Sequence, residues 1–120
     1  MRAFAASLIL FCLLIGGVIL LSHSAIGRLD GYLAALPSGD DPTAEEGAVR
    51  ALAKRISGEL GLLNAVFHHS QVDSLLAALA RAVAAAESRD GVEYRILTYE
   101  VRRILTDMRL DLTPLLSDIW

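Results

Sequence analysis

A long run without a charged side chain, Ala3 to Leu21 (AFAASLILFCLLIGGVILL), constrains this chain more than any other feature. At a rise of about 1.5 Å per residue, a helix of this length spans nearly the ~30 Å hydrocarbon core of a bilayer. The run accounts for much of the hydrophobic content, which at 54% is high for a soluble domain. The sequence therefore predicts an N-terminal membrane anchor, which we place at residues 1–23.

A cleaved signal peptide is the alternative interpretation of the same segment. Residues 22–24 (SHS) would serve as a cleavage site before Ala25, but the apolar core of a signal peptide normally runs only about 7–15 residues. A lipoprotein signal fits poorly, because Cys12 lies in the middle of the run and follows Phe11 rather than a small residue. The length of the run favours an uncleaved anchor.

Charges at the two ends of the anchor bear on its orientation. Arg2 and the α-amino group flank one end, whereas Arg28 at the other end is partly offset by Asp30. Because positive charge is retained on the cytoplasmic side, this bias predicts that the N-terminus lies inside. We therefore expect a single-pass protein of the cell membrane with an extracytoplasmic domain.

The residues after the anchor are helical in pattern, with no alternation typical of strands. Apolar side chains first continue at spacings of three and four, at Ile26, Leu29, Leu33 and Leu36. The membrane helix is therefore expected to extend as a stalk, until two prolines and a glycine within 37–42 predict a turn. We interpret residues 24–43 as the stalk helix and turn, and residues 44–120 as a helical domain with an apolar C-terminal tail.

The first helix of that domain is predicted to begin at Thr43. Thr43 and Glu46 have the capping-box arrangement, in which a hydroxyl and a later glutamate satisfy two otherwise unpaired amides. The apolar stripe of this helix ends at Phe67. Gly58 and Gly61 lie inside it, and each costs about 1 kcal/mol relative to alanine. They indicate either the close approach of another helix or a bend.

Two further helices are predicted, at about Gln71 to Ser88 and about Gly91 to Met108. The loop between them is so short that they must be antiparallel neighbours. The predicted fold class is all-α: an N-terminal transmembrane helix that continues into a small antiparallel helical bundle. The apolar stripe of the last helix consists of Tyr94, Leu97, Val101, Ile104 and Met108.

Outside the anchor the chain is mildly acidic and its charges are mixed. Without Arg2, ten of the eleven basic residues remain against fourteen acidic ones, and the arginines alternate with acids rather than cluster. A basic surface is the usual requirement for binding nucleic acid, so no nucleic-acid partner is expected. Cys12 is the only cysteine, so an intramolecular disulfide is impossible.

The adjacent histidines His68 and His69 are the most conspicuous candidates for chemistry. We place them in the last turn of the preceding helix or just beyond it, with Ser70 as the next N-cap, where an imidazole can donate to unpaired carbonyls. The alternative is a metal corner of His69 and Asp73, but zinc normally takes three or four protein ligands. We therefore interpret His68, His69 and Asp73 as a structural helix junction, with no metal site and no cofactor.

No sequence motif indicates catalysis. Ser70 stands beside His69, but adjacency in sequence is not the geometry of a catalytic triad, and no glycine elbow surrounds the serine. The sequence also has no glycine-rich phosphate-binding loop. We assign no catalytic residue and expect that the protein is not an enzyme.

The C-terminal tail, LDLTPLLSDIW, is too apolar to remain in water. Pro114 is expected to bar a simple continuation of the last helix. The tail is therefore predicted either to fold back over the seam between helices or to dock into a partner. The residues that would do so are Leu115, Leu116, Ile119 and Trp120.

The order of these segments resembles a known family. An anchor, an acidic helix, the segment HHSQVDSLLAALARAV and the ending LSDIW are similar to small membrane-anchored bacterial proteins catalogued as domain of unknown function 4363. The most specific parts are His69 with Val72 and Asp73, and the last four residues, whereas Ile56 stands where many relatives carry a tryptophan. The resemblance covers nearly the whole chain and implies a single-pass protein with a helical domain and no assigned activity.

Two functional hypotheses follow. The first is a membrane-tethered, non-catalytic helical interaction module that scaffolds or regulates a membrane-protein partner or a neighbouring copy. It rests on the mixed surface charge, the apolar tail and the lack of a catalytic motif. The second is an extracytoplasmic ligand-sensing or solute-binding bundle, because helical bundles accommodate pockets between their helices.

Overall fold

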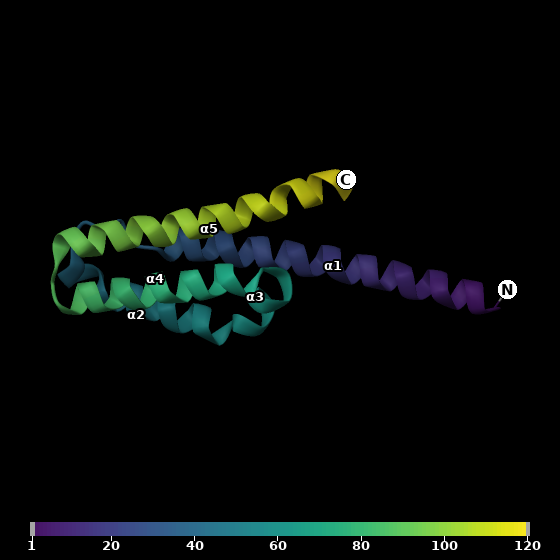
Figure 1. Ribbon diagram of the computed structural model, residues 1–120, viewed down its shortest axis with the longest axis horizontal. Helices are drawn as coiled ribbons and strands as arrows, with labels where there is room; N and C mark the ends of the chain where they lie inside the picture. Colours follow the sequence, from purple (N-terminus) through teal and green to yellow (C-terminus); the bar gives the residue numbers. More distant parts are fainter. Residues whose placement is uncertain (1, 120) are drawn as a thin grey trace.

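The computed structural model describes the backbone of residues 2–119 and the side chains of residues 2–112 (Figure 1). The described backbone forms five helices and no strand, so the predicted all-α class is confirmed. The helices are α1 (Arg2–Ala35), α2 (Pro42–Gly58), α3 (Leu60–Val66), α4 (His69–Glu87) and α5 (Gly91–Ile119).

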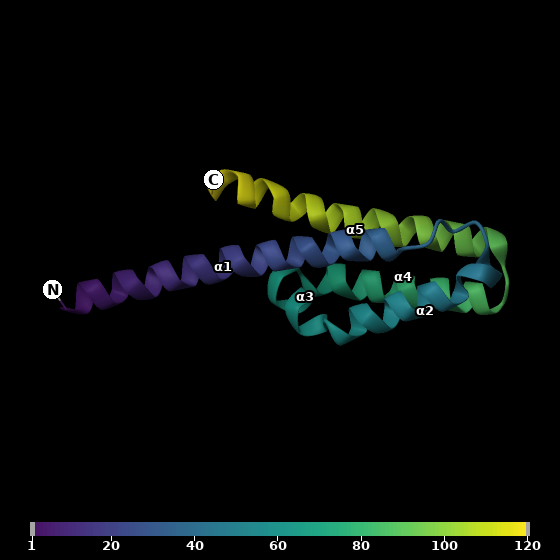
Figure 2. The same ribbon diagram turned by 180° about the vertical axis from the view of Figure 1, so that it is seen from behind.

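The four long helices form an up-and-down bundle. Each of them runs antiparallel to the next, and α5 returns to lie along α1, so the contacts α1–α2, α2–α4, α4–α5 and α5–α1 close a ring (Figures 1 and 2). The short α3 lies at the end of the bundle from which α1 projects. Short connections between antiparallel neighbours are the usual basis of this topology.

The 34-residue α1 is at once the apolar N-terminal segment and a helix of the bundle. Between Phe4 and Leu21 its large apolar side chains are exposed, except for the half-buried Ile19. An 18-residue window of the helix is long and apolar enough to cross a membrane, with none of it buried. Further along, Ala25, Leu29 and Tyr32 have no exposed surface. The predicted separation of a stalk (24–43) from the domain (44–120) is therefore wrong, because these apolar residues pack against α3 and α5.

The start of α2 differs from the prediction by two residues. Asp41, not Thr43, is the N-cap, and its carboxylate accepts from the amides of Thr43 and Ala44 at 3.1 and 3.2 Å. Pro42 takes the first helical position, for which its fixed φ is suited. Glu45 rather than Glu46 completes the cap by accepting from the Asp41 amide at 2.8 Å.

The helix predicted from Thr43 to Phe67 is broken between α2 and α3. Glu59 lies at the break, and its amide donates to the carbonyl of Ile56 at 3.0 Å. A Cβ built at Gly58 or Gly61 would meet no described atom within 4 Å. Of the two interpretations of these glycines, the bend therefore holds and the close approach of another helix does not.

The backbone of α5 continues through Pro114 to Ile119, so the predicted interruption of this helix at Pro114 is wrong. A proline in a helix removes one hydrogen bond, here the one to the carbonyl of Leu110, and tends to bend the axis. Near the end of a long helix a single lost bond is tolerated. Residues 113–119 therefore extend α5 rather than turn back over the bundle.

Candidate functional site

The two histidines do not occupy the positions predicted for them. His68 is the N-cap of α4 and His69 is its first residue, and both side chains are exposed. The backbone carbonyl of His68 accepts from the amides of Gln71 and Val72, whereas its imidazole makes no capping bond. The prediction that the imidazoles cap the end of the preceding helix is wrong, because that helix ends at Val66 and both rings stand at the beginning of the next.

The alternative interpretation, a metal corner of His69 and Asp73, gains no further ligand among the described side chains. Asp73 is exposed on α4, one turn beyond His69. Among the described side chains, no group of three histidine, cysteine, aspartate or glutamate residues lies close enough to hold a metal ion.

A polar cluster centred on Glu59 ties the α2–α3 break to α1. The hydroxyl of Tyr32 donates to Oε2 of Glu59, and Nη1 of Arg28 lies 2.9 Å from Oε1. The guanidinium of Arg55 lies over the Tyr32 ring, 5.2 Å from its centroid, within the range of a cation–π contact. Gly31 makes room for that guanidinium, because a Cβ there would lie 3.1 Å from Arg55 Nη2.

The Glu59 cluster shifts the ionisation of both partners in opposite directions. Burial raises the pKa of Tyr32, and the hydrogen bond to Glu59 raises it further. Burial works against ionisation of Glu59, but the Tyr32 hydroxyl and the Arg28 guanidinium outweigh it and lower the pKa of that carboxyl. The pair is therefore a neutral phenol held by a carboxylate, and it ties α1 to the break between α2 and α3.

A second cluster of the same chemistry closes the other end of the bundle. Glu45 accepts from the amides of Gly39 and Asp41 at 2.8 Å each and from the hydroxyl of Tyr94 at 3.1 Å. Burial disfavours the ionised form of Glu45, but these donors outweigh it and lower the pKa of the carboxyl. Burial, together with Glu45, raises the pKa of Tyr94 to about 12.

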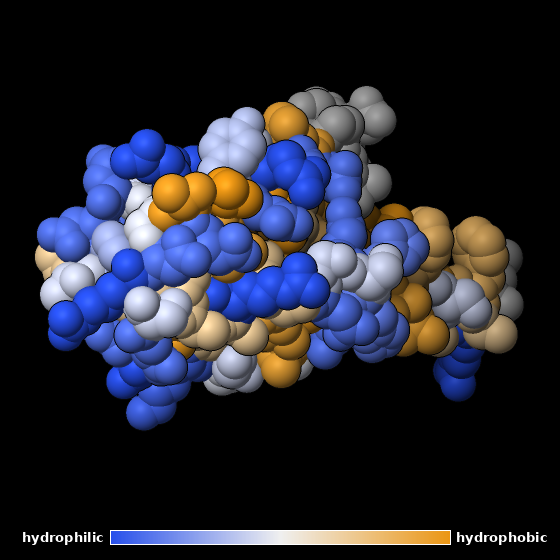
Figure 3. Space-filling model, turned by 60° about the vertical axis from the view of Figure 1, so that its left-hand side comes forward, coloured by the Kyte–Doolittle hydropathy of each residue, from blue (hydrophilic) through white to orange (hydrophobic). Residues whose placement is uncertain are grey.

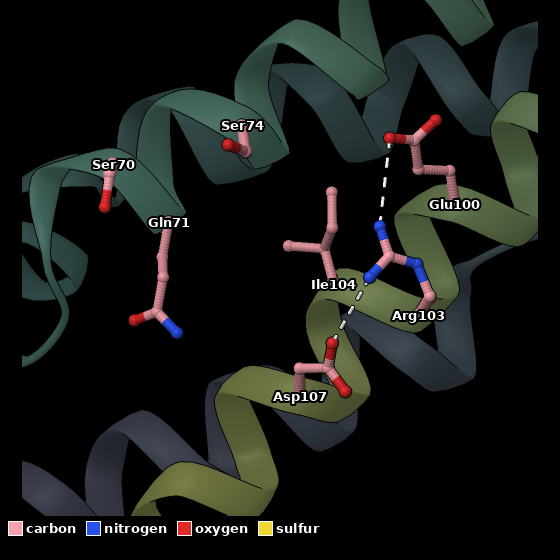
Figure 4. A pocket seen from close by; sticks show the side chains of 7 residues that line it. All are labelled: Ser70, Gln71, Ser74, Glu100, Arg103, Ile104 and Asp107. Atoms are coloured by element: carbon pink, nitrogen blue, oxygen red, sulfur yellow. Dashed lines mark ion pairs between the residues drawn. The ribbon is translucent and has the colours of Figure 1, made fainter.

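A polar hollow lies between the start of α4 and the middle of α5 (Figure 4). It has a volume of about 280 Å³, and most of its lining side chains are exposed. Arg103 is its cationic group, and it already pairs with Glu100 at 3.9 Å and Asp107 at 3.5 Å on its own helix. The groove is therefore a shallow polar surface whose arginine is already paired with two acidic side chains of its own helix. Its lining consists of Ser70, Gln71, Ser74, Glu100, Arg103, Ile104 and Asp107.

The surface of α5 that faces away from the bundle carries four large hydrophobic side chains that are exposed to solvent. Val92, Ile96, Tyr99 and Leu110 are 74, 55, 67 and 56% exposed, and we call these four residues the outer ridge. Within residues 2–112, every other exposed large hydrophobic side chain lies on α1 between Phe4 and Leu21. Figure 3 shows hydrophobic surface on the projecting part of α1, and hydrophobic side chains among hydrophilic ones along the upper part of the bundle.

Sequence reasoning missed the outer ridge and both tyrosine–glutamate clusters. The ridge left a signal, because Val92, Ile96 and Tyr99 each stand beside a charged residue on the helix, outside its predicted apolar stripe. The clusters join residues 27 and 49 positions apart, and no local pattern announces such pairs. The candidate tail residues Leu115, Leu116 and Ile119 lie outside the residues whose side chains are described, and Trp120 lies outside the described backbone.

Comparison with known proteins adds no assignment to this geometry. No protein-family model, curated protein or solved structure matches the chain, and the resemblance to domain of unknown function 4363 therefore stays a prediction.

Proposed function

We propose that this chain is a membrane-tethered, non-catalytic interaction module: α1 spans the cell membrane once, and the bundle on its extracytoplasmic side presents the outer ridge to a protein partner. The observation that carries the proposal is the distribution of exposed hydrophobic side chains over two helices, α1 and α5. A bilayer would cover those of α1 but not those of α5, which lie on the bundle. Exposed apolar side chains grouped on one face are typical of a surface that binds another protein.

The continuity of α1 supports a retained anchor over a cleaved signal peptide. Leu21 and Ser22 line a small cavity together with Val66 of α3 and Leu112 of α5, so the bundle begins where the exposed apolar run ends. Cleavage after Ser24 would cut α1 between Ser22 and Ala25, which are both buried. Because α1 is both the anchor and a helix of the core, cleavage would remove part of the bundle and lower its stability.

Orientation can be tested with single engineered cysteines in a Cys12→Ser background. Asp41→Cys lies in the turn at the far end of the bundle and should react with a membrane-impermeant maleimide in intact cells. A cysteine inserted between Met1 and Arg2, which keeps the Arg2 charge, is the matched control at the other end of the chain and should react only after permeabilisation. The reverse pattern would place the bundle in the cytoplasm.

The interaction surface can be tested by site-specific photo-crosslinking in membranes. A photoreactive residue at Ile96 or Tyr99 should give protein adducts, because these positions lie on the outer ridge. The same residue at Ala51 of α2 or Ala84 of α4, both exposed, is the matched control and should give none. Equal adduct formation at all four positions, or none at any, would contradict the proposed interaction module. A small molecule that raises the melting temperature, with the effect lost in Arg103→Gln, would instead support the ligand-sensing alternative.

A further inference from the structure

The spacing of the outer ridge is that of a coiled-coil seam. Val92, Ile96 and Tyr99 are four and three residues apart, and the same alternation continues through Arg103 and Thr106 to Leu110. Hydrophobic residues repeated at this spacing form the a and d positions of a heptad, the side that packs against a second helix. All four residues of the outer ridge occupy a or d positions of this one register.

The rest of α5 confirms that this seam faces away from the bundle. The buried side chains of the helix lie on its opposite face. They are Tyr94, Leu97, Thr98, Val101, Ile104, Leu105, Met108 and Leu112. The core thus occupies one side of α5 and leaves the seam free to meet another helix along its length.

The charges that flank the seam are sorted by sign. The residue before each a position is an arginine, at Arg95, Arg102 and Arg109. The residue after each d position is an acid, at Glu93, Glu100 and Asp107. In heptad terms every g position is basic and every e position is acidic.

This sorting distinguishes between possible partners. In a parallel pair of identical helices, a g residue faces the e residue five positions later in the other copy. Arg95 would then face Glu100 of a second copy, and Arg102 would face Asp107. In an antiparallel pair, g faces g and e faces e, which would place arginine against arginine and acid against acid. The charges therefore favour a second copy of this chain in parallel orientation.

We propose that two copies of this chain associate in the membrane through the outer ridges of their α5 helices, packed in parallel. The inference rests on the proposed function, since it names the partner of the same surface. The tether supplies the required orientation, because α5 lies along α1 in the opposite direction and two copies anchored in one membrane present their α5 helices in parallel (Figure 1). Confinement to one membrane also raises the effective concentration of the two surfaces.

The existing contacts of the flanking arginines leave Arg95 and Arg102 able to pair with the acidic residues of a second copy. Arg95 lies 3.9 Å from Asp40 in a pair whose side chains are both more than 70% exposed. Arg102 gives one hydrogen bond to the carbonyl of Pro37, and a guanidinium carries five N–H donors. Arg109 is held by Asp30 of α1 at 2.6 Å, so the pairing is assigned to Arg95 and Arg102 alone.

Arg103 stands at an a position in the middle of the seam and limits its strength. A polar residue at one a position is known to fix register and oligomeric state at a cost in stability. Here the two copies of Arg103 would face each other, and each is partly neutralised by Glu100 and Asp107 of its own helix. Arg103→Leu should therefore strengthen the association, whereas Ile96→Asp should weaken it.

Disulfide formation across the seam tests both the occupant and its direction. The full chain in a Cys12→Ser background would be reconstituted in lipid vesicles with Ile96→Cys and treated with a mild oxidant. A parallel pair places the two cysteines opposite each other, so a species of twice the chain mass should form. Ala84→Cys, exposed on α4, is the control and should not cross-link. In an antiparallel pair position 96 would face the Arg103–Thr106 region, and failure of Ile96→Cys to cross-link would overturn the parallel arrangement.

Charge reversal tests the ion pairs between the two copies and distinguishes their loss from a loss of folding. Arg95→Glu with Arg102→Glu, and separately Glu100→Arg with Asp107→Arg, should each lower cross-linking at position 96 by about tenfold. Mixing the two variants should restore it, because every flanking pair is then opposite in sign. Loss of cross-linking without restoration, in variants that keep their helical circular dichroism, would overturn the proposal. Photo-adducts at Ile96 with another protein, but never with a second copy, would refute self-association and leave the interaction module standing.

Discussion

The hydroxyl of Tyr94 donates to Oε1 of Glu45, 49 residues earlier in the chain, at 3.1 Å. The bond joins the first turn of α5 to the first turn of α2 at the end of the bundle farthest from the projecting part of α1 (Figure 1). Tyr94 has no exposed surface. The contact therefore fixes the two helix starts against the turn that connects α1 to α2.

Removing this hydroxyl should destabilise the bundle by about 1 kcal/mol, the usual net worth of a buried hydrogen bond. Tyr94→Phe keeps the ring and deletes only the donor to Glu45. Thermal unfolding of the full chain in detergent, followed by circular dichroism, measures the change. Tyr99→Phe, at an exposed position, is the matched control and should unfold like the wild-type protein. Equal stability of both variants would show that the bond contributes nothing.

Acid should weaken the same end of the bundle. The pKa of Glu45 is lowered from its ordinary value of 4.5 in the folded state, so its contribution is present above pH 4.5 and is lost as the pH falls through the folded value. Glu45→Gln should be less stable at neutral pH and less sensitive to acid. Glu46→Gln keeps the contacts of Glu45 and should retain the wild-type acid dependence. A Glu45→Gln variant with an unchanged acid transition would contradict this assignment.

Loss of Glu59 should be more costly than loss of any surface carboxylate. Glu59→Ala leaves the buried Tyr32 hydroxyl and the Arg28 guanidinium without this partner, which we expect to cost about 2–3 kcal/mol. Glu87→Ala removes an ion pair with Arg50 between side chains that are both more than half exposed, and should change stability by less than about 1 kcal/mol. Denaturant unfolding of the two variants gives the comparison, and equal losses would refute a special role for Glu59.

Gly39 should not accept a side chain. Its φ of +90° lies in the region that side chains disfavour, and a Cβ there would lie 3.1 Å from Cβ of Thr98. We expect Gly39→Ala to lower stability by more than about 1 kcal/mol. Gly47→Ala, inside α2 with no described atom within 4 Å of the new Cβ, should raise stability by up to about 1 kcal/mol. The difference between their melting temperatures decides the matter, and a stabilised Gly39→Ala would contradict the argument.

Replacing the histidines should leave the bundle almost unchanged. Both imidazoles are exposed at the start of α4, and neither caps it. His68→Ala and His69→Ala are therefore each expected to change stability by less than about 0.5 kcal/mol. A larger loss in either variant, measured by thermal unfolding, would show that the imidazole has a structural role that its position does not explain.

The parts of this fold with a regular hydrophobic spacing could be predicted from the sequence alone. The stripe predicted for the last helix, from Tyr94 to Met108, is buried, because spacings of three and four place those side chains on one face. The N-cap of α2 was misplaced although Pro42 indicated it, since a proline prefers the first helical position and therefore makes Asp41 the cap.

The packing between helices could not be obtained in this way. Which face of α1 meets α3 depends on side chains far apart in the chain, so Tyr32 and Glu59 are brought together only by the complete fold. The outer ridge was missed for the opposite reason. Its hydrophobic residues share one helix with a stronger buried stripe, and the stronger pattern determined the prediction.

The uninterrupted passage of α1 from the apolar segment into the bundle has a mechanical consequence. A flexible linker would let the bundle reorient freely, whereas a continuous helix would make it a lever fixed to the apolar segment, which we propose spans the membrane. At about 1.5 Å per residue the part of α1 within the bundle is about 20 Å long, so a change of about 10° in tilt would displace its far end by about 3.5 Å. Because helices tilt to match the thickness of the bilayer, thinner and thicker membranes would hold two neighbouring bundles at different angles. The membrane itself would then set how closely the far ends of two α5 helices approach.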